Sequence, residues 1–138
     1  RSQIEIVRSY SEEVPQAYGN AGKLQQVFTN LLLNARDAIP DGGRITVMTS
    51  TGEDGSLVVE VADTGVGIAP ENVAKIYDPF YTTKGVGQGT GLGLAVSYGI
   101  VQEHAGHISV DSMPGRGTTF RITLPSARVR ARLQAVGD

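Results

Sequence analysis

Residues 57–67 read LVVEVADTGVG, a pattern typical of a β-strand that ends at an aspartate and runs into a glycine-rich turn. Alternate side chains of a strand share one face, so Leu57, Val59, Val61 and Asp63 form a single row. A carboxylate in register with core side chains is costly unless it accepts hydrogen bonds. The glycines after Asp63 let the backbone approach a ligand closely. The carboxylate could then accept a hydrogen bond from an exocyclic amino group such as that of adenine, although an ordinary Asx turn fits the same residues.

Hydrophobic periodicity predicts the elements on both sides of this strand. Apolar positions with a helical period, after a plausible N-cap at Asn20, predict a helix over residues 21–39. The other expected elements are strands at 3–10, 44–51, 56–63, 107–111 and 117–124, helices at 70–76 and 91–104, and a long loop at 77–90. Together they favour an α+β two-layer sandwich, with a mixed sheet of about five strands and about three helices on one face. We expect one domain over residues 1–125 and a C-terminal tail over 126–138.

Composition narrows the class of protein. The 138 residues suit one domain, and 40% of them are apolar. A formal charge of −2 gives no electrostatic footprint for nucleic acid or an anionic membrane, so we expect no nucleic-acid partner and no direct membrane contact. The chain has no cysteine, which excludes disulfides and thiolate metal sites. No apolar run approaches the ~20 residues that a membrane span needs. Because it begins without methionine, we expect an excised fragment of a longer protein.

The predicted helix at 21–39 carries a polar row beside its core-facing row. Asn30 and Asn34 are four residues apart and therefore share a face, on which Asp37 also falls. Three leucines in succession at 31–33 predict a helix that is covered on most sides, so its amides need partners. A Mg²⁺ ion with phosphate oxygens is one suitable partner. An ordinary solvated or self-paired amide face is the alternative.

The loop at 77–93 holds glycines at every second position from Gly85 to Gly93. Such a run suits neither a packed strand nor a helix interior, and a long glycine-rich loop that leads into a helix N-terminus is typical of phosphate binding. The glycines would also let the loop open and close as a lid. Neither a Walker A motif nor a dinucleotide-binding fingerprint is present, and a flexible linker is the alternative. Charge and hydroxyl donors could come from Thr82, Thr83, Lys84 and Thr90.

In this order the motifs resemble those of the ATP-binding catalytic domain of sensor histidine kinases, in a superfamily shared with type II topoisomerase ATPases, mismatch-repair ATPases and a heat-shock chaperone. Residues 30–35 resemble the N box, 63–67 the G1 box, 78–84 the F box and 89–94 the G2 box, and 117–118 resemble the last glycine motif. The match covers residues 3–125, and the residues of its motifs are most similar to those of the nitrogen-regulation-like kinases. The resemblance implies a Bergerat-type fold with a glycine-rich ATP lid, and ATP and Mg²⁺ as cofactors.

The resemblance also implies roles for the matched residues. Asn34 would bind Mg²⁺, and Asn30 would help to position the phosphates. Asp63 would accept a hydrogen bond from the adenine amino group, and Thr118 would support the same end, directly or through water. Lys84 would meet the phosphates and share the catalytic role with Asn30. Nucleotide contacts are further implied for Asp37, Gly65, Gly67, Ile68, Phe80, Thr82, Thr83, Gly89, Thr90, Gly91, Leu92, Gly93 and Leu94.

The identity of residue 30 bears on mechanism. In the superfamily's ATPases the matching residue is a glutamate that activates water, whereas the amide of Asn30 cannot serve as a base. The resemblance therefore implies transfer of the γ-phosphoryl to a histidine, for which the domain positions the phosphoryl group and neutralises charge. Neither His104 nor His107 lies in an acceptor-like setting, so we expect both to be structural or surface residues.

The partners implied by the resemblance are ATP or ADP, a separate dimerisation and histidine-phosphoacceptor domain of the same kinase, and a response regulator downstream. We expect a cytoplasmic location, whether the parent kinase is free or anchored in a membrane.

Three alternatives stay open. A topoisomerase- or mismatch-repair-type ATPase would release phosphate steadily, an anti-sigma-factor kinase would phosphorylate a partner's serine, and a degenerate module would fail to bind nucleotide. Asn30 and the loop from Phe80 to Lys84 argue against the first, and the same loop argues against the second. The presence of every motif argues against the third.

Overall fold

The computed structural model describes residues 3–17, 19–77 and 93–126. Its five strands form one sheet in the order β1-β2-β3-β5-β4. The strand β1 runs parallel to β2, and the other neighbouring strands are antiparallel. In chain order the elements are β1 (Ile4–Tyr10), α1 (Ala21–Ala38), β2 (Gly43–Thr51), β3 (Leu57–Asp63), α2 (Pro70–Val73), α3 (Gly93–Glu103), β4 (His107–Met113) and β5 (Gly117–Leu124).

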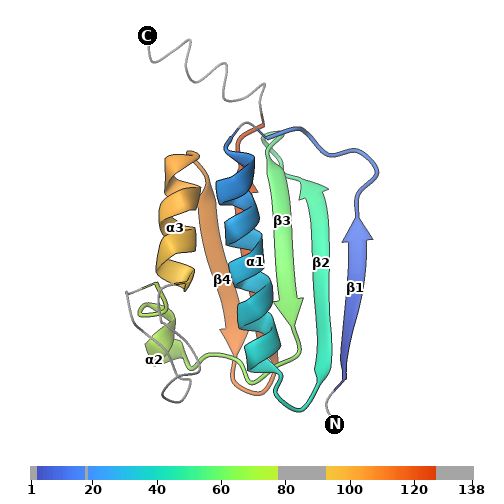
Figure 1. Cartoon of the computed structure of the whole chain (residues 1–138), viewed down its shortest axis with the longest axis vertical. Helices are drawn as coiled ribbons and strands as arrows, with labels where there is room; N and C mark the ends of the chain where they lie inside the picture. The colour runs from blue at the N-terminus through green and yellow to red at the C-terminus, as the bar shows by residue number, and fades with distance from the viewer. Residues whose placement is uncertain (1–2, 18, 78–92, 127–138) are drawn as a thin grey trace.

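The helices lie on one face of the sheet (Figure 1). The helix α1 crosses the middle of the sheet, and α3 lies beside it over β4. This arrangement confirms the predicted α+β fold with a mixed sheet of five strands and helices on one face. The predicted lid lies outside the described residues.

The helix α2 and the strand β4 end two or more residues from their predicted ends, whereas α1 and α3 each end one residue early. The helix α2 stops at Val73 rather than at residue 76, because the N–H of Lys75 turns back to the carbonyl of Asn72 (2.9 Å). The strand β4 continues past residue 111, because its antiparallel ladder with β5 extends to the pair Met113–Gly117. The extra residues of β4 matter for the site, because they bring the strand level with the end of β3.

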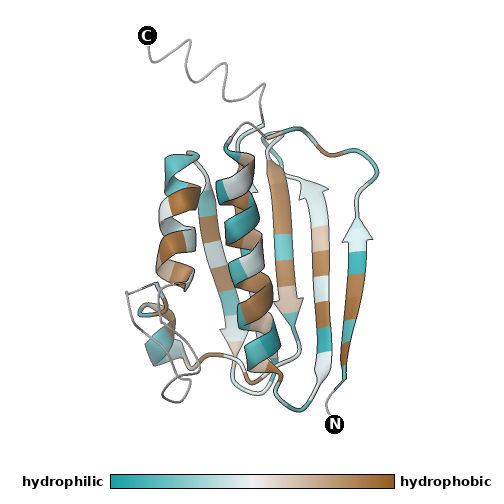
Figure 2. Cartoon of the chain, in the orientation of Figure 1, coloured by the Kyte–Doolittle hydropathy of each residue, from teal (hydrophilic) through white to brown (hydrophobic). Residues whose placement is uncertain are grey.

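The hydrophobic core lies between α1, α3 and the helix-covered face of the sheet. Val27, Leu31 and Ala35 recur every four residues along α1, and each is at most 2% exposed. Figure 2 shows the hydrophobic residues along β3 and α3. The rest of the described chain contributes Ile45, Val61, Ile76, Ile100, Val101, Ile108, Phe120, Ile122 and Leu124 to the same cluster.

The helix α1 begins as predicted but is less covered than expected. The Asn20 side chain accepts a hydrogen bond from the N–H of Lys23 (2.9 Å), which caps the first turn. Leu33 is 41% exposed, so the prediction that three successive leucines imply a helix covered on most sides is wrong. Three consecutive residues of a helix span about 200° of its circumference, so one of them faces solvent when the first packs on a sheet.

The described chain is packed up to its last residue. Ser126 is 5% exposed and forms an isolated β-bridge with Ala17. Residues 127–138 lie outside the described residues, so the predicted division into a domain and a tail stays a prediction. In the part of the chain that the structure covers, no helix is long and apolar enough to cross a membrane.

A pair of leucine substitutions tests the assigned core face. We expect Leu31→Ala to lower the free energy of unfolding by about 3 kcal/mol, because it deletes buried methyl groups and leaves a cavity. The control, Leu33→Ala on the exposed side of the same helix, should change that free energy by less than about 0.5 kcal/mol. Urea denaturation measures both variants. Similar losses from the two substitutions would contradict the packing of α1.

Candidate functional site

Asp63 ends β3 at the edge of the core. The residue is 7% exposed, and its side chain continues the row of Val59 and Val61, as the alternation predicts. Its Oδ1 atom accepts a hydrogen bond from the N–H of Gly65 (2.8 Å). Burial raises the pKa of Asp63 above its ordinary value of 3.8, although the backbone N–H groups of Gly65 and Thr118 act to lower it. The site therefore holds a carboxylate that is costly to ionise and that keeps acceptor capacity beyond the Gly65 bond.

Gly65 holds the loop after Asp63 against the end of α1. A Cβ atom at residue 65 would overlap the carbonyl oxygen of Ala38 and would lie 2.8 Å from Asp63 Oδ1. The N–H of the next residue, Val66, donates to the same Ala38 carbonyl (3.0 Å). The loop is thereby fixed to the end of the helix that carries the polar row.

Gly67 and Gly117 allow two further close approaches of the backbone. Gly67 (φ +76°) lies against the carbonyl oxygen of Met113, and Gly117 (φ +93°) lies against that of Asp63. A Cβ atom at either glycine would overlap the oxygen that it faces, and a positive φ is itself unfavourable for other residues. Close backbone packing around Asp63 therefore accounts for these glycines. The predicted contacts of Gly65 and Gly67 with an adenine base stay predictions.

Two hydroxyl groups extend the site from Asp63 towards β4. Thr118 is 4% exposed and is the β5 partner of Asp63 in the ladder. Its Oγ1 lies 2.7 Å from Ser112 Oγ, which in turn accepts a hydrogen bond from the N–H of Ile68 (2.8 Å). Thr118 and Ile68 are among the site residues predicted from the sequence, whereas Ser112 is not. Alternation along β4, counted from the buried Ile108, could have placed Ser112 on the same face.

Asn30 ties α1 to the start of α3. Its Nδ2 atom donates hydrogen bonds to the carbonyl of Gly93 (3.1 Å) and to Ser97 Oγ (3.2 Å). Ser97 is fully buried, so this contact lies within the helix interface. The amide nitrogen therefore has partners inside the chain, which the polar row alone did not predict. A role of Asn30 towards phosphates stays a prediction.

Asn34 and Asp37 are half-buried and follow Asn30 along the polar row of α1. Asp37 pairs with Arg36 (3.3 Å). The amide oxygen of Asn34, together with phosphate oxygens and water, suits the hard-ligand preference of Mg²⁺. The described residues contain no group of three His, Cys, Asp or Glu side chains that could hold a metal ion. This donor set therefore fits an ion that arrives with a phosphate ligand better than a site made by protein alone.

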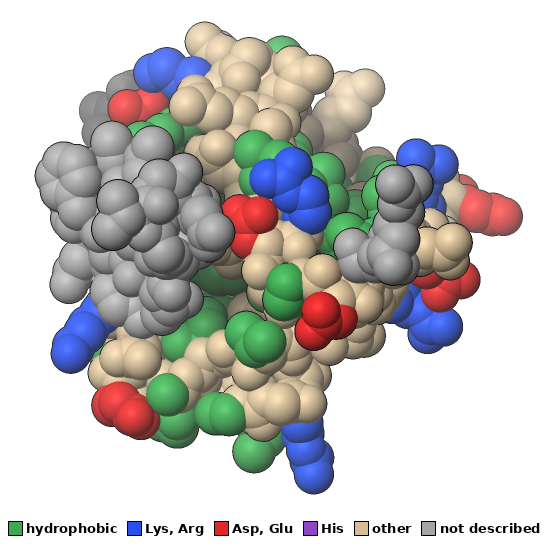
Figure 3. Space-filling view, turned by 60° about the horizontal axis from the view of Figure 1, so that its bottom comes forward, with side chains coloured by type: hydrophobic (Ala, Val, Ile, Leu, Met, Phe, Trp, Pro, Cys, Tyr) green, Lys and Arg blue, Asp and Glu red, His purple; other side chains and the backbone are tan. Residues whose placement is uncertain are grey.

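The structure brings together part of the predicted site. Asp63, Thr118 and Ile68 meet at one end of the sheet, and Gly93 and Leu94 begin α3, where Leu94 packs against the core as Ile68 does. Figure 3 looks onto this end of the molecule, where acidic and basic side chains are scattered rather than gathered into one patch. The predicted site residues outside the described ranges are Phe80, Thr82, Thr83, Lys84, Gly89, Thr90, Gly91 and Leu92.

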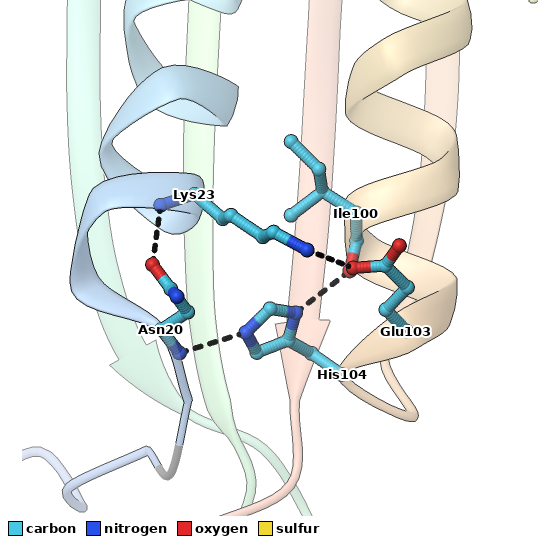
Figure 4. A network of polar contacts seen from close by, with 5 residues as sticks. All are labelled: Asn20, Lys23, Ile100, Glu103 and His104. Carbon is cyan, nitrogen blue, oxygen red and sulfur yellow. Dashed lines mark hydrogen bonds and ion pairs between the residues drawn. The ribbon is translucent and has the colours of Figure 1, made fainter.

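His104 forms a second tie between the same two helices, at their opposite ends. Its Nε2 accepts a hydrogen bond from the N–H of Asn20 (3.0 Å), and its Nδ1 donates to the carbonyl of Ile100 (2.7 Å) (Figure 4). This pair of contacts requires a neutral imidazole with its hydrogen on Nδ1. Because Asn20 caps α1, the histidine joins the first turn of α1 to the last turn of α3.

The surroundings of His104 show that it fills a structural position. The residue is 7% exposed, and a Cβ atom at Gly19 would overlap its ring. The neighbouring ion pair between Lys23 and Glu103 (3.0 Å) is more than half exposed on both sides, so it contributes below about 1 kcal/mol. The expectation of a structural histidine is confirmed.

Substitution of the two histidines tests this tie. We expect His104→Ala to lower the free energy of unfolding by about 2 kcal/mol or more, because it leaves a cavity and an unpaired N–H at Asn20. His107→Ala is the matched control, since His107 is exposed, and it should change stability by less than about 0.5 kcal/mol. Urea denaturation at neutral pH measures the difference. Equal stability of the two variants would contradict the tie.

The raised pKa of Asp63 predicts a pH-dependent cost to stability. An aspartate whose pKa is higher in the fold than in the unfolded chain stabilises the fold at low pH, and that contribution is lost as pH rises from 3.8 through the raised value. An asparagine at this position cannot ionise, so the Asp63→Asn variant keeps the stability that the wild type loses as pH rises. We therefore expect the melting temperature of the variant to exceed that of the wild type, by a difference that grows between about pH 4 and pH 7. The exposed Asp111→Asn is the control. A difference that shrinks with rising pH would contradict the assignment.

The chain is similar to known proteins over most of its length. Residues 19–128 match the family model of histidine kinase-, DNA gyrase B- and HSP90-like ATPases. The chain is 42% identical to the sensor kinase CckA of Brucella abortus over 136 residues, which cover 88% of this chain but 14% of CckA. The solved structure of the mycobacterial sensor histidine kinase MprB superposes with a TM-score of 0.80 at 28% identity, covering 89% of this chain and 84% of that one.

A second solved structure carries a nucleotide analogue. Full-length ShkA in complex with AMPPNP superposes with a TM-score of 0.76 at 31% identity, covering 90% of this chain and 26% of ShkA. The chain thus spans about a quarter or less of the full-length kinases that it matches.

Proposed function

The chain belongs to the family of histidine kinase-, DNA gyrase B- and HSP90-like ATPases, and from this premise we propose that it binds MgATP and transfers the γ-phosphoryl group to a histidine. The acceptor would lie on a separate dimerisation and phosphoacceptor domain, and a response regulator would receive the phosphoryl group downstream. Similarity to sensor kinases over nine-tenths of the chain supports this reading. Because ATP is available there, the cytoplasm is the proposed compartment, whether the parent kinase is free or membrane-anchored.

The buried carboxylate of Asp63 carries the proposal. None of the ion pairs between described residues involves Asp63, so its charge has no cationic partner there. A buried carboxylate without such a partner is costly unless it is well hydrogen-bonded, and Gly65 supplies one such bond. An amino group of a ligand, such as that of adenine, would supply another donor. The backbone contacts around residues 65–67 hold this loop close to the end of α1 and to β4, beside the carboxylate.

The polar row of α1 supports phosphoryl transfer over hydrolysis. An amide such as that of Asn30 has no basic atom to activate water. Asn34 and Lys84 would hold the phosphate end, and Mg²⁺ bound there would neutralise charge on the phosphates. In the transfer, the bond from the γ-phosphorus to the ADP oxygen breaks as a bond to the acceptor imidazole nitrogen forms. The proton of the other imidazole nitrogen is released to solvent.

Calorimetric titration of MgATP and ADP into the chain tests nucleotide binding. We expect Mg²⁺-dependent binding of ATP by the wild type and a loss of about 10- to 100-fold in affinity for Asp63→Asn, because a hydrogen bond to a charged acceptor is replaced by one to a neutral acceptor. Asp111→Asn, on the exposed face of β4, should bind as the wild type does. A folded wild-type chain that binds neither nucleotide would instead indicate a degenerate module.

The acceptor is tested by adding a separately produced phosphoacceptor domain of a sensor histidine kinase. Acid-labile, base-stable phosphate on that domain is the expected result, with little phosphate released from ATP by the catalytic chain alone. Steady phosphate release without an acceptor would favour the ATPase alternative, and phosphoserine on a partner would favour the anti-sigma-factor kinase.

A further inference from the structure

Ser112 joins three segments at the part of the candidate site around Asp63 and Thr118, where the proposed adenine would bind. Its hydroxyl oxygen accepts a hydrogen bond from the N–H of Ile68 (2.8 Å), in the loop that follows β3. The same hydroxyl lies 3.1 Å from the carbonyl of Gly117, to which it can donate, and 2.7 Å from Thr118 Oγ1. One side chain of β4 therefore holds both the loop and the first two residues of β5.

Asp63, Thr118 and Ser112 form a polar row across three adjacent strands. Thr118 pairs with Asp63 in the β3–β5 ladder and with Ser112 in the β4–β5 ladder, so the three side chains share the helix-covered face. The neighbouring row on that face is apolar and contains Val61, Phe120 and Val110. The polar row thus lies where the core ends and the candidate site begins. Packing alone would be satisfied by apolar residues at these positions.

The hydrogen bonds of Ser112 restrict the direction of the Thr118 hydroxyl. A serine hydroxyl has one hydrogen and two acceptor lone pairs. All partners of Ser112 are satisfied at once when it accepts from the Ile68 N–H, donates to the Gly117 carbonyl and accepts from the Thr118 hydroxyl. In that arrangement the only hydrogen of the Thr118 hydroxyl points at Ser112. Thr118 then presents acceptor lone pairs, as does Asp63 beside it.

We propose that Ser112 is a positioning residue for base selectivity, which orients the Thr118 hydroxyl so that Thr118 and Asp63 both act as acceptors towards the nucleobase or a water bound to it. Such an edge suits a base with an exocyclic amino group and disfavours one with a carbonyl at that position. Removal of Ser112 would free the Thr118 hydrogen to turn towards the ligand and would weaken this discrimination. The inference rests on the proposed nucleotide function.

The test compares the affinities of ADP and inosine diphosphate, which carries a carbonyl in place of the amino group. Calorimetry would be run on the wild type, Ser112→Ala, Thr118→Val and the double variant. We expect Ser112→Ala to lower the ratio of ADP affinity to inosine diphosphate affinity about tenfold. In the Thr118→Val background the same substitution should change the ratio by less than about twofold, because Ser112 acts through Thr118. Ser109→Ala, on the opposite face of β4, should leave the ratio unchanged.

The outcomes separate a positioning role from a structural one. A lowered melting temperature of Ser112→Ala with an unchanged affinity ratio would overturn the inference, as would an equal change in the ratio with and without Thr118. If Ser112→Ala does not fold, Ser112→Cys takes its place, and its weaker hydrogen bonds should give a smaller fall in the ratio. A wild-type chain that binds no nucleotide overturns the proposed function as well. Normal wild-type binding that Asp63→Asn weakens, with no effect of Ser112, overturns this inference alone.

Discussion

The carbonyl oxygen of Ala38, at the end of α1, receives the N–H of Val66 at 3.0 Å and leaves no room for a side chain at Gly65. This contact sets the distance between the helix and the loop that follows β3. The N–H of Gly65 then lies where it can bond to Asp63 Oδ1 at 2.8 Å. The position of the carboxylate is thus set by backbone contacts, which lack the rotamer freedom of side chains. A site built in this way is pre-organised before a ligand arrives.

The two helices above the sheet are held together at both ends. Near the site, the Asn30 amide bonds to the first residue of α3, and at the other end His104 bonds to the cap residue of α1. The His104 contact satisfies the backbone N–H of Asn20, one of the N–H groups at a helix start that have no partner within the helix. The Asn30 contact gives the carbonyl of Gly93 a side-chain donor from α1. The helices therefore resist sliding along one another.

Periodicity predicted the fold class and most element bounds to within one residue, because the apolar stripe of α1 and the alternation of β3 are local properties. The buried position of Asp63 could also be predicted, since it continues a row of core side chains. The contacts of Ser112 with β5 could not be predicted, because they depend on the register between β4 and β5, and register is a long-range property. The partners of Asn30 could not be predicted either, because they lie 63 and 67 residues away in the sequence and leave no local signal. The burial of Leu33 was predicted wrongly, because a run of apolar residues does not show how much of the helix circumference is covered.

The hydrogen bond made by Asn30 also bears on whether the domain transfers the γ-phosphoryl group or hydrolyses ATP. Its Nδ2 atom donates to the carbonyl of Gly93 at 3.1 Å. A glutamate at this position, as in the hydrolysing members of the superfamily, would bring an oxygen without a hydrogen towards the same carbonyl. Two acceptors that face each other in a partly buried contact repel, and the carbonyl would lose its donor. The packing of α1 against the start of α3 thus favours an amide at residue 30. Asn30 therefore joins the two helices through a side chain that cannot activate water. The proposed preference for phosphoryl transfer is consistent with the helix packing as well as with the residue types of the site.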